Sequence, residues 1–283
     1  MYVYIYAVAP RQAPSTLLAR DADIAAAAAG GRASVRRRQV GLAPWFAAGG
    51  TGIDTALDYK DQPVIGQLLA SAKKPRSSYF MTTKIPTHRV KSLTAAYALS
   101  AVQTDVRQLG VGRLDLVLIH HPAPTDAENQ ALWKGLEQAV AMNLTRSIGL
   151  SNFNKEQIEA LLKIATIRPS LNQCDLSVGG QDTQCGDRDE AIAYNLAQNI
   201  TYEAWSPMKN CPFTNAIVTK AAAAHNVSAS QVCLRWVLDR GCTIAVGTGS
   251  DPSKAAAYSK ENLDLFGFAL TAAELNAINK IAA

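Results

Sequence analysis

The sequence lacks any long hydrophobic run and any clear export signal. No apolar stretch approaches the ~20 residues that a membrane-spanning helix needs. Residues 2–9 are apolar, but no Lys or Arg precedes them, as the start of a secretory signal requires. The Ala- and Arg-rich stretch 18–38 contains Asp21 and Asp23, which are atypical of a transit peptide. We therefore expect a cytoplasmic protein with no membrane partner.

Cysteine is scarce as well. The 283 residues include five cysteines, an odd number, and no two of them form a Cys-x-x-Cys pair. This pattern argues against a disulfide scaffold and against a zinc site, and it suits a reducing compartment. We therefore expect no metal site, and we expect no disulfide framework among Cys174, Cys185, Cys211, Cys233 and Cys242.

Charge is limited too, at 18% of the residues and a formal net charge of +5. The dense basic run of Arg32, Arg36, Arg37 and Arg38 has no interleaved aromatic residues, so we interpret it as the solvated start of a helix. Nucleic acid is therefore not an expected partner. The mild positive charge does suit an anionic ligand such as a dinucleotide phosphate.

The sequence does contain a regular alternation of short β-branched runs and longer amphipathic, Ala-rich segments. Alternation of this kind is typical of repeated βα units and a parallel sheet. With 48% apolar residues, residues 1–283 can form one domain, and eight such units predict an α/β fold of the (β/α)8 TIM-barrel type. The expected strands are Tyr2–Ala7, Gly52–Asp54, Tyr79–Thr83, Leu114–Ile119, Ser147–Leu150, Leu171–Gln173, Thr201–Ala204 and Thr243–Val246.

The expected helices follow these strands, and several begin with a capping signature. A short polar residue precedes Glu or Gln by three positions at Asn154, Ser228 and Thr271. The expected helices span 35–48, 61–73, 91–109, 127–142, 154–165, 187–198, 213–225, 228–240, 252–260 and 272 to the C-terminus.

Four ionisable residues lie at or just after three successive expected strands. Asp54 ends the second strand and Tyr59 follows it, while Lys84 and His120 follow the third and fourth strands. Catalytic residues of TIM barrels lie at this end of the strands. A nearby ammonium stabilises a phenolate, a carboxylate holds that ammonium in place, and an imidazole orients a carbonyl group. Each residue alone has an ordinary structural interpretation, so the hypothesis of an acid-catalytic site depends on their joint placement.

Six segments carry a resemblance to one family, in matching order and spacing. Over roughly residues 36–283 the chain resembles the aldo-keto reductases. The segments are 53–59 with Asp54 and Tyr59, 78–84 ending in Lys84, 114–122 with His120, Gly149–Phe153, Asn172-Gln173 and Ala204–Pro207.

The resemblance implies a (β/α)8 barrel that reduces aldehydes or ketones to alcohols by hydride transfer. The hydride donor that it implies is NADPH, with NADH as the alternative, bound in extended form. It implies that Tyr59 is the proton donor, that Lys84 and Asp54 support it, and that His120 orients a small-molecule carbonyl substrate. It also implies cofactor contacts from Ser151, Asn152, Gln173, Trp205 and Ser206. Trp205 stands where the family usually has Tyr, and another aromatic face can stack on the nicotinamide ring equally well.

Three regions depart from the family pattern. Residues 1–34 form a divergent N-terminal segment without the usual first strand ending in Gly-Thr, although Tyr2–Ala7 can supply a strand of another kind. At the adenosine end of the cofactor, Thr248 and Gly249 stand in place of a Lys-Ser pair, and Lys254 replaces an Arg. His121 stands where the family often has Trp, which changes a wall of the substrate pocket.

Two other functional classes remain open from the sequence. A catalytically weak nucleotide-binding sensor or regulatory subunit is favoured by the unusual N-terminus but needs no acid such as Tyr59. A hydrolase built on another barrel would need paired carboxylates or a metal cluster at the strand ends, and the sequence shows neither. We expect a monomer or a weak homodimer.

Overall fold

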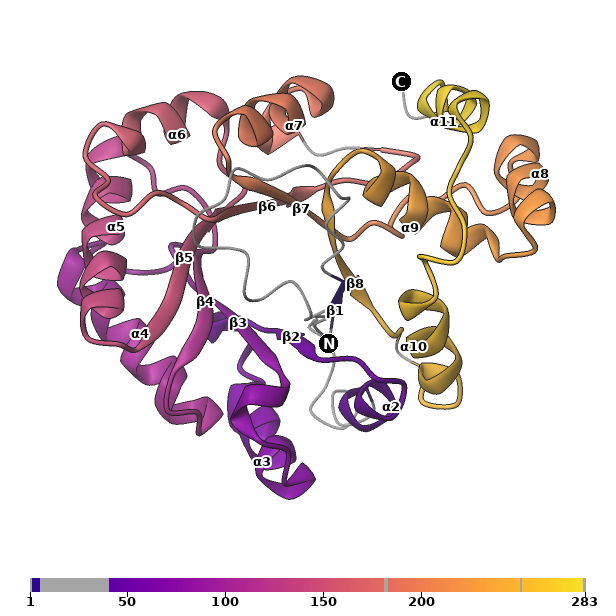
Figure 1. Ribbon diagram of the computed structural model, residues 1–283. Coiled ribbons are helices and arrows are strands. Elements are labelled where there is room, and N and C mark those ends of the chain that lie inside the picture. The colour runs from indigo at the N-terminus through magenta and orange to yellow at the C-terminus, as the bar shows by residue number, and fades with distance from the viewer. Residues whose placement is uncertain (1, 6–40, 181–182, 250, 282–283) are drawn as a thin grey trace.

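The computed structural model describes residues 2–5, 41–180, 183–249 and 251–281. Eight strands pair in chain order into a closed barrel, which confirms the expected α/β barrel (Figure 1). Each strand overlaps the run predicted for it. The strands are β1 (Tyr2–Ile5), β2 (Gly52–Asp54), β3 (Phe80–Ile85), β4 (Leu114–Ile119), β5 (Thr145–Ser151), β6 (Leu171–Asp175), β7 (Thr201–Trp205) and β8 (Thr243–Gly247).

The first strand departs from the all-parallel pattern. β1 runs antiparallel to both β2 and β8, whereas every neighbouring pair from β2 to β8 is parallel. The prediction of a strand near the N-terminus is confirmed, but the parallel direction is wrong for it. An apolar run predicts extended backbone, and an antiparallel strand satisfies the backbone groups of β2 and β8 as well as a parallel one does. Composition therefore does not determine the direction.

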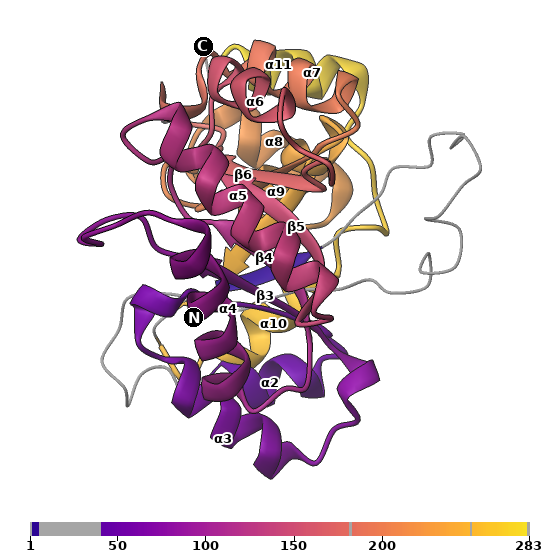
Figure 2. The ribbon, with the colours of Figure 1, turned by 90° about the vertical axis from the view of Figure 1, so that its left-hand side faces the viewer.

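Helices surround the barrel, and from α3 onward their bounds lie within a few residues of those predicted. The helix predicted over 35–48 is described only from Leu42, because residues 35–40 lie outside the described residues. Figure 2 shows α4, α5 and α6 on the outside of the strands that they connect. The α-helices are α2 (Leu42–Ala47), α3 (Gln62–Ala72), α4 (Ala95–Leu109), α5 (Asp126–Ala141), α6 (Lys155–Leu162), α7 (Arg188–Ala197), α8 (Ala216–His225), α9 (Ala229–Asp239), α10 (Ala255–Leu263) and α11 (Ala272–Asn279).

Capping explains several of these helix starts. The capping boxes predicted at Asn154, Ser228 and Thr271 are all formed, and a further one is formed at Thr125 with Glu128. In each, the side chain at the N-cap accepts from a backbone N–H three residues on, and the Glu or Gln there returns a bond to the N-cap backbone. Local sequence alone therefore fixes these boundaries.

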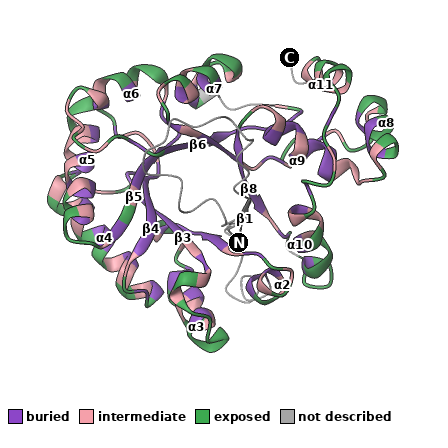
Figure 3. Ribbon diagram, viewed as in Figure 1, coloured by how far each residue is buried: buried purple, intermediate pink, exposed green. Residues whose placement is uncertain are grey.

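The main core lies between the strands and the helices that surround them. The strands are buried while the outward faces of the helices are exposed (Figure 3). One apolar cluster packs around β2–β5 and α3–α6, and a second packs around β6–β8 and α7–α9. Trp45, Trp133 and Trp236 are the largest side chains in these clusters, and all three are fully buried.

Inside the barrel, the side chains change from apolar to polar along the strands. Leu116, Leu118 and Leu171 form a small apolar cluster. Because side chains alternate along a strand, Leu171 and Gln173 point to the same face of β6. Gln173 is buried, as are Asp54 and other polar residues near the carboxyl ends of the strands. The apolar layer thus supports a polar layer, in which the site is built.

Two disulfides correct the expectation drawn from the cysteine count. Cys174 pairs with Cys185, Cys211 pairs with Cys233, and Cys242 is a buried free thiol. An odd count does not prevent pairing, because one cysteine can stay buried as an apolar residue. The expectation of no disulfides is therefore wrong. The cytoplasmic location that partly depended on it stays a prediction.

Removing the Cys211–Cys233 disulfide is expected to destabilise the fold measurably. The bond joins residues separated by 22 positions, so its loss frees a large loop in the unfolded chain. We expect Cys233→Ala to lower the free energy of unfolding by about 3 kcal/mol, measured by urea denaturation without reductant. Cys242→Ala is the control, since it removes a buried thiol without breaking a disulfide. Equal losses in the two variants would show that the cross-link contributes nothing.

The absence of a membrane span and the helix start at the basic run near the N-terminus were also predicted from the sequence. Among the described residues, no helix is both long enough and apolar enough to span a bilayer. The basic run from Arg32 to Arg38 lies outside the described residues, as does most of the divergent segment 1–34.

Candidate active site

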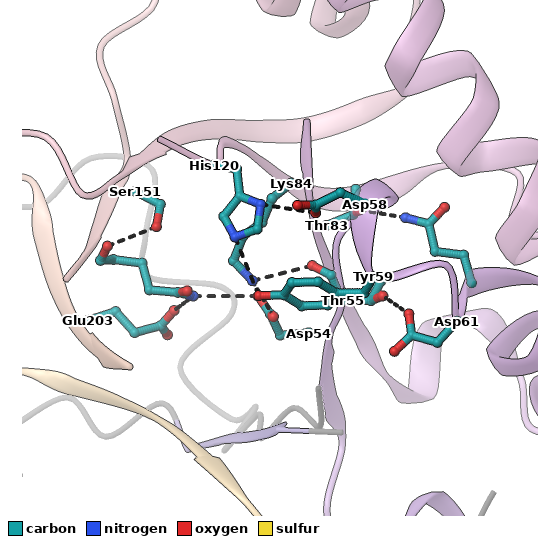
Figure 4. Close-up of polar contacts among 12 residues, drawn as sticks. Asp54, Thr55, Asp58, Tyr59, Asp61, Thr83, Lys84, His120, Ser151 and Glu203 are labelled. Carbon is teal, nitrogen blue, oxygen red and sulfur yellow. Dashed lines mark hydrogen bonds and ion pairs between the residues drawn. The ribbon is translucent and has the colours of Figure 1, made fainter. Parts of the chain in front are cut away.

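The four residues predicted to form an acid-catalytic site gather at one end of the barrel (Figure 4). Asp54 is the last residue of β2, and Lys84 is the second-last residue of β3. His120 follows β4 directly, and Tyr59 ends a 3-10 helix, η1 (Leu57–Tyr59), after β2. The parallel ladder from β2 to β4 brings these strand ends together.

A buried ion pair forms the base of the site. The Nζ atom of Lys84 donates to Oδ1 of Asp54 and also to the backbone carbonyl of Thr55 at 3.3 Å. The side chains of Lys84 and Asp54 are only 1% and 0% exposed. Burial raises the pKa of Asp54 to about 7, although the Lys84 ammonium opposes this shift. Lys84 Nζ also lies 5.5 Å from the ring centre of Tyr59, which places its charge beside the phenol.

Tyr59 and His120 are in direct contact. The hydroxyl of Tyr59 lies 3.4 Å from Nε2 of His120, and the two rings meet edge to face. Burial lowers the pKa of His120, so the ring is neutral near pH 7. A neutral imidazole protonated on Nδ1 presents a lone pair at Nε2, which can accept from the phenol.

Asp58 determines this tautomer, and sequence reasoning missed it. Its carboxylate lies 3.1 Å from Nδ1 of His120. Because a carboxylate can only accept a hydrogen bond, this contact favours the tautomer with the proton on Nδ1. Although burial opposes the change, the bond to His120 lowers the pKa of Asp58. The side chain is 38% exposed and so reaches solvent. Its position next to Tyr59 in the sequence is a signal, but only the fold brings it to a histidine 62 residues away.

The residues expected to contact the nicotinamide lie on the neighbouring strands. Ser151 ends β5, and its hydroxyl donates to the backbone carbonyl of Gln173 at 2.9 Å. Asn152 has a left-handed backbone with φ of 65°, and its amide nitrogen donates to the backbone carbonyl of His120. Its Oδ1 accepts from Nε1 of Trp205 at 2.9 Å. These bonds join β5, β6 and β7 to the end of β4.

Gln173 connects this group to the ion pair and also contacts Glu203, a residue that the sequence reasoning did not select. Its Nε2 donates to Oε1 of Glu203 at 2.7 Å and lies 3.4 Å from Oδ2 of Asp54. Glu203 is completely buried in β7, and burial raises its pKa to about 8. A single acidic residue in a predicted strand gives no signal of such a role, because the partner lies on another strand.

The other expected cofactor residues lie further along the same end of the barrel. Trp205 ends β7 half-buried, and Ser206 follows it with a left-handed backbone. Thr248 follows β8 and is buried, while Lys254 is exposed at the start of α10. Thr248 and Lys254 therefore occupy the β8 side of the site, beyond the network that joins Asn152, Gln173 and Trp205.

A cavity of about 350 Å³ is lined by Asn152 and by His121, the residue after His120. His121 stacks on the His120 ring, with centres 4.6 Å apart, and contributes a wall in place of the expected Trp. Burial lowers the pKa of His121 to about 4, so this wall is polar and uncharged near pH 7. The lining residues are His88, His121, Pro122, Ala123, Asn152, Gln157 and Gln184.

A buried carboxyl group behind the site gives a pH-dependent stability. Asp105 of α4 accepts from Nε2 of Gln62 at 2.5 Å, and burial raises its pKa to about 8 from an ordinary 3.8. Between these values the folded state keeps a proton that the unfolded state has lost, so stability falls as pH rises. We expect Asp105→Asn, which cannot ionise, to gain roughly 4 kcal/mol in free energy of unfolding over wild type between pH 5 and pH 8, at about 1.4 kcal/mol per pH unit, measured by thermal unfolding. A constant difference across that range would contradict the assignment.

Comparison with known proteins identifies the family of the chain. The family model described as the aldo/keto reductase family matches residues 30–283. An aldo-keto reductase of Mycolicibacterium vanbaalenii is 32% identical over 228 residues, which is 80% of this chain and 77% of that protein. A 2,5-diketo-D-gluconic acid reductase B of a Corynebacterium species is 30% identical and covers 86% of this chain and 84% of its own length.

Solved structures give the same result. An aldo/keto reductase of Brucella melitensis superposes with a TM-score of 0.80 at 27% identity, covering 90% of this chain and 93% of the other. An aldo-keto reductase of Bombyx mori in complex with NADP superposes with a TM-score of 0.79 at 27% identity, covering 96% and 94% of the two chains. The chain belongs to the aldo/keto reductase family.

Proposed function

We propose that the protein reduces aldehydes or ketones to alcohols, with NADPH as hydride donor and Tyr59 as proton donor. The contact of the Tyr59 hydroxyl with His120, beside the buried Lys84–Asp54 pair, is the observation that carries this proposal. The reductase names of relatives such as the methylglyoxal reductase of Yersinia pestis, 29% identical over 256 residues, support the reaction class.

Proton transfer in this proposal follows from the contacts of the phenol. A carbonyl oxygen placed at the Tyr59 hydroxyl takes its proton, and the phenolate left behind lies beside the Lys84 ammonium. Asp54 holds that ammonium in place. His120 accepts from the phenol and so positions the Tyr59 hydroxyl against the carbonyl oxygen, and Asp58 keeps the His120 ring in the tautomer that allows this.

The neighbouring residues fit a nicotinamide amide and ring. When bound, the cofactor supplies the hydride that reaches the carbonyl carbon. Ser151, Asn152 and Gln173 offer neutral donors and acceptors, as an amide requires, and the half-buried indole of Trp205 offers an aromatic face. Ser206, directly after β7, and Thr248, directly after β8, are proposed to extend this set of cofactor contacts. The cavity lined by His121 and Asn152 is the proposed place for the body of a small carbonyl substrate. A monomer or weak homodimer stays the proposed assembly.

Lys254 is proposed to hold the 2′-phosphate that distinguishes NADPH from NADH. It is an exposed cation at the start of α10, where the helix dipole also favours an anion. We expect Lys254→Ala to weaken NADPH binding by about 3- to 10-fold and to leave NADH binding unchanged, because charge-assisted hydrogen bonds are worth about 1 kcal/mol or more. Titration of both cofactors by quenching of tryptophan fluorescence measures this, and an equal change for both would remove Lys254 from phosphate recognition.

The direct test of the function is turnover of a small panel of aldehydes and ketones with NADPH and with NADH. Loss of cofactor absorbance with formation of the alcohol is the expected result. Cofactor binding without turnover of any carbonyl would overturn the enzymatic proposal and favour a nucleotide-binding sensor. Absence of both binding and turnover would overturn the cofactor assignment as well.

A further inference from the structure

Glu203 is a buried acidic residue that contacts Gln173 and Thr243, next to the proposed reaction site. It is 0% exposed, it lies in the middle of β7, and it faces the cluster around Asp54 and Lys84 (Figure 4). Its Oε1 accepts from Gln173 at 2.7 Å, and its Oε2 accepts from the hydroxyl of Thr243 in β8 at 3.3 Å. A carboxyl group removed from water needs such partners, because burial without them is costly.

The amide of Gln173 is thereby held in one orientation. A glutamine amide has two N–H donors on Nε2 and an acceptor oxygen on the other side of its carbon. Nε2 faces two carboxyl groups, with Glu203 at 2.7 Å and Asp54 at 3.4 Å. Asp54 is the partner of the Lys84 ammonium, and a carboxylate can only accept. Both N–H groups of Gln173 are therefore directed at acidic side chains.

We propose that Glu203 is a positioning residue of the nicotinamide site, which holds Gln173 so that its Oε1, and not its Nε2, meets the carboxamide of the cofactor. This inference depends on the proposed function, in which Gln173 contacts that carboxamide. The ligand group recognised is then the NH₂ of the carboxamide, because an oxygen acceptor requires a donor. Without Glu203, the amide loses the stronger of these two contacts and can rotate.

The charges of the cluster agree with this role. Burial raises the pKa of Glu203 to about 8, and the neighbouring Asp54 contributes to the shift. The charges of the Lys84 ammonium and of the two carboxyl groups, Asp54 and Glu203, sum to zero when one of the carboxyl groups keeps its proton. A protonated Glu203 still offers an oxygen to Gln173 and can direct its own proton to Thr243. The orientation of the Gln173 amide is thus kept near neutral pH.

The experiment compares two cofactors that differ only at the carboxamide. NADP⁺ carries the NH₂ group, whereas its 3-acetylpyridine analogue carries a methyl ketone that cannot donate. Dissociation constants are measured by quenching of tryptophan fluorescence in wild type, Glu203→Leu and Glu203→Gln. We expect wild type to prefer NADP⁺ by about 3- to 10-fold, the usual effect of one hydrogen bond. Glu203→Leu should lose that preference, mainly through weaker binding of NADP⁺.

Glu203→Gln is the matched control, because its side-chain oxygen can still accept from Gln173 while its own amide donates to Thr243. It should retain the preference for NADP⁺. Thermal unfolding and circular dichroism identify any variant that is misfolded. If Glu203→Leu is misfolded, Thr243→Val provides a second test, because it removes the hydroxyl from which Glu203 Oε2 accepts. Thr243→Val should reduce the preference for NADP⁺.

Three results would overturn the inference. They are a wild type that binds both cofactors equally, a Glu203→Leu variant that keeps the wild-type preference, and an equal loss of affinity for both cofactors in that variant. The last would indicate a structural role only. A wild type that binds neither cofactor would overturn the cofactor assignment itself, and this outcome is distinct from the other three.

Discussion

Tyr59→Phe is expected to lower kcat by roughly 10²- to 10⁴-fold, the usual contribution of a positioned general acid. The substitution removes only the hydroxyl that contacts His120 at 3.4 Å and keeps the ring. Because the proposed nicotinamide contacts come from β5, β6 and β7, the dissociation constant of NADPH should stay near that of wild type. Steady-state turnover of an aromatic aldehyde and fluorescence titration of the cofactor measure the two quantities.

Tyr194→Phe is the matched control for this loss. Tyr194 lies on α7, away from the strand ends, and its ring packs at the edge of the core. Its turnover should equal that of wild type. A Tyr59→Phe variant with an unchanged kcat would remove the phenol from the mechanism, whatever the cofactor affinity.

Lys84→Met is expected to lower kcat by at least about 10²-fold, because it removes the cation that stabilises the phenolate after proton transfer. Methionine fills most of the space of the lysine stem in a site that is 1% exposed. Asp54 then loses the ammonium that holds its pKa down and takes up a proton, so no unpaired charge stays buried. The fold should therefore survive, and thermal unfolding checks this.

The exposed Lys163 supplies the control for the lysine variant. Lys163 lies on the surface at the end of α6, so Lys163→Met should change neither turnover nor cofactor binding. If Lys84→Met retained wild-type turnover, the buried ion pair with Asp54 would be a feature of the fold and not of the reaction.

Much of the fold could be predicted because the signals are local. The period of each apolar run gave the strands, and the polar residues at Asn154, Ser228 and Thr271 gave helix starts to within a residue. The direction of β1 and the pairing of the cysteines were not predictable in this way. Both depend on which distant segments meet, and residue types alone do not determine that.

The candidate site shows the same division. Asp54, Lys84 and His120 were found because they follow strands, and parallel strands bring their ends to one edge of the barrel. Asp58 and Glu203 were not found, because each acts on a residue of another strand, and only coordinates give such a distance. Motif order therefore predicted residues that the fold brings together at the candidate site, but it did not predict the side chains that contact and orient them.

The most direct test of the central claim is whether Tyr59 and Lys84 act as one unit. Single-turnover oxidation of bound NADPH by an aldehyde can be followed by stopped-flow absorbance in wild type, Tyr59→Phe, Lys84→Met and the double variant. If the ammonium acts only through the phenol, the double variant should be no slower than the slower single variant, because residues that work together lose their effects together. Losses that multiply in the double variant would show that the two side chains act independently, and would contradict this account.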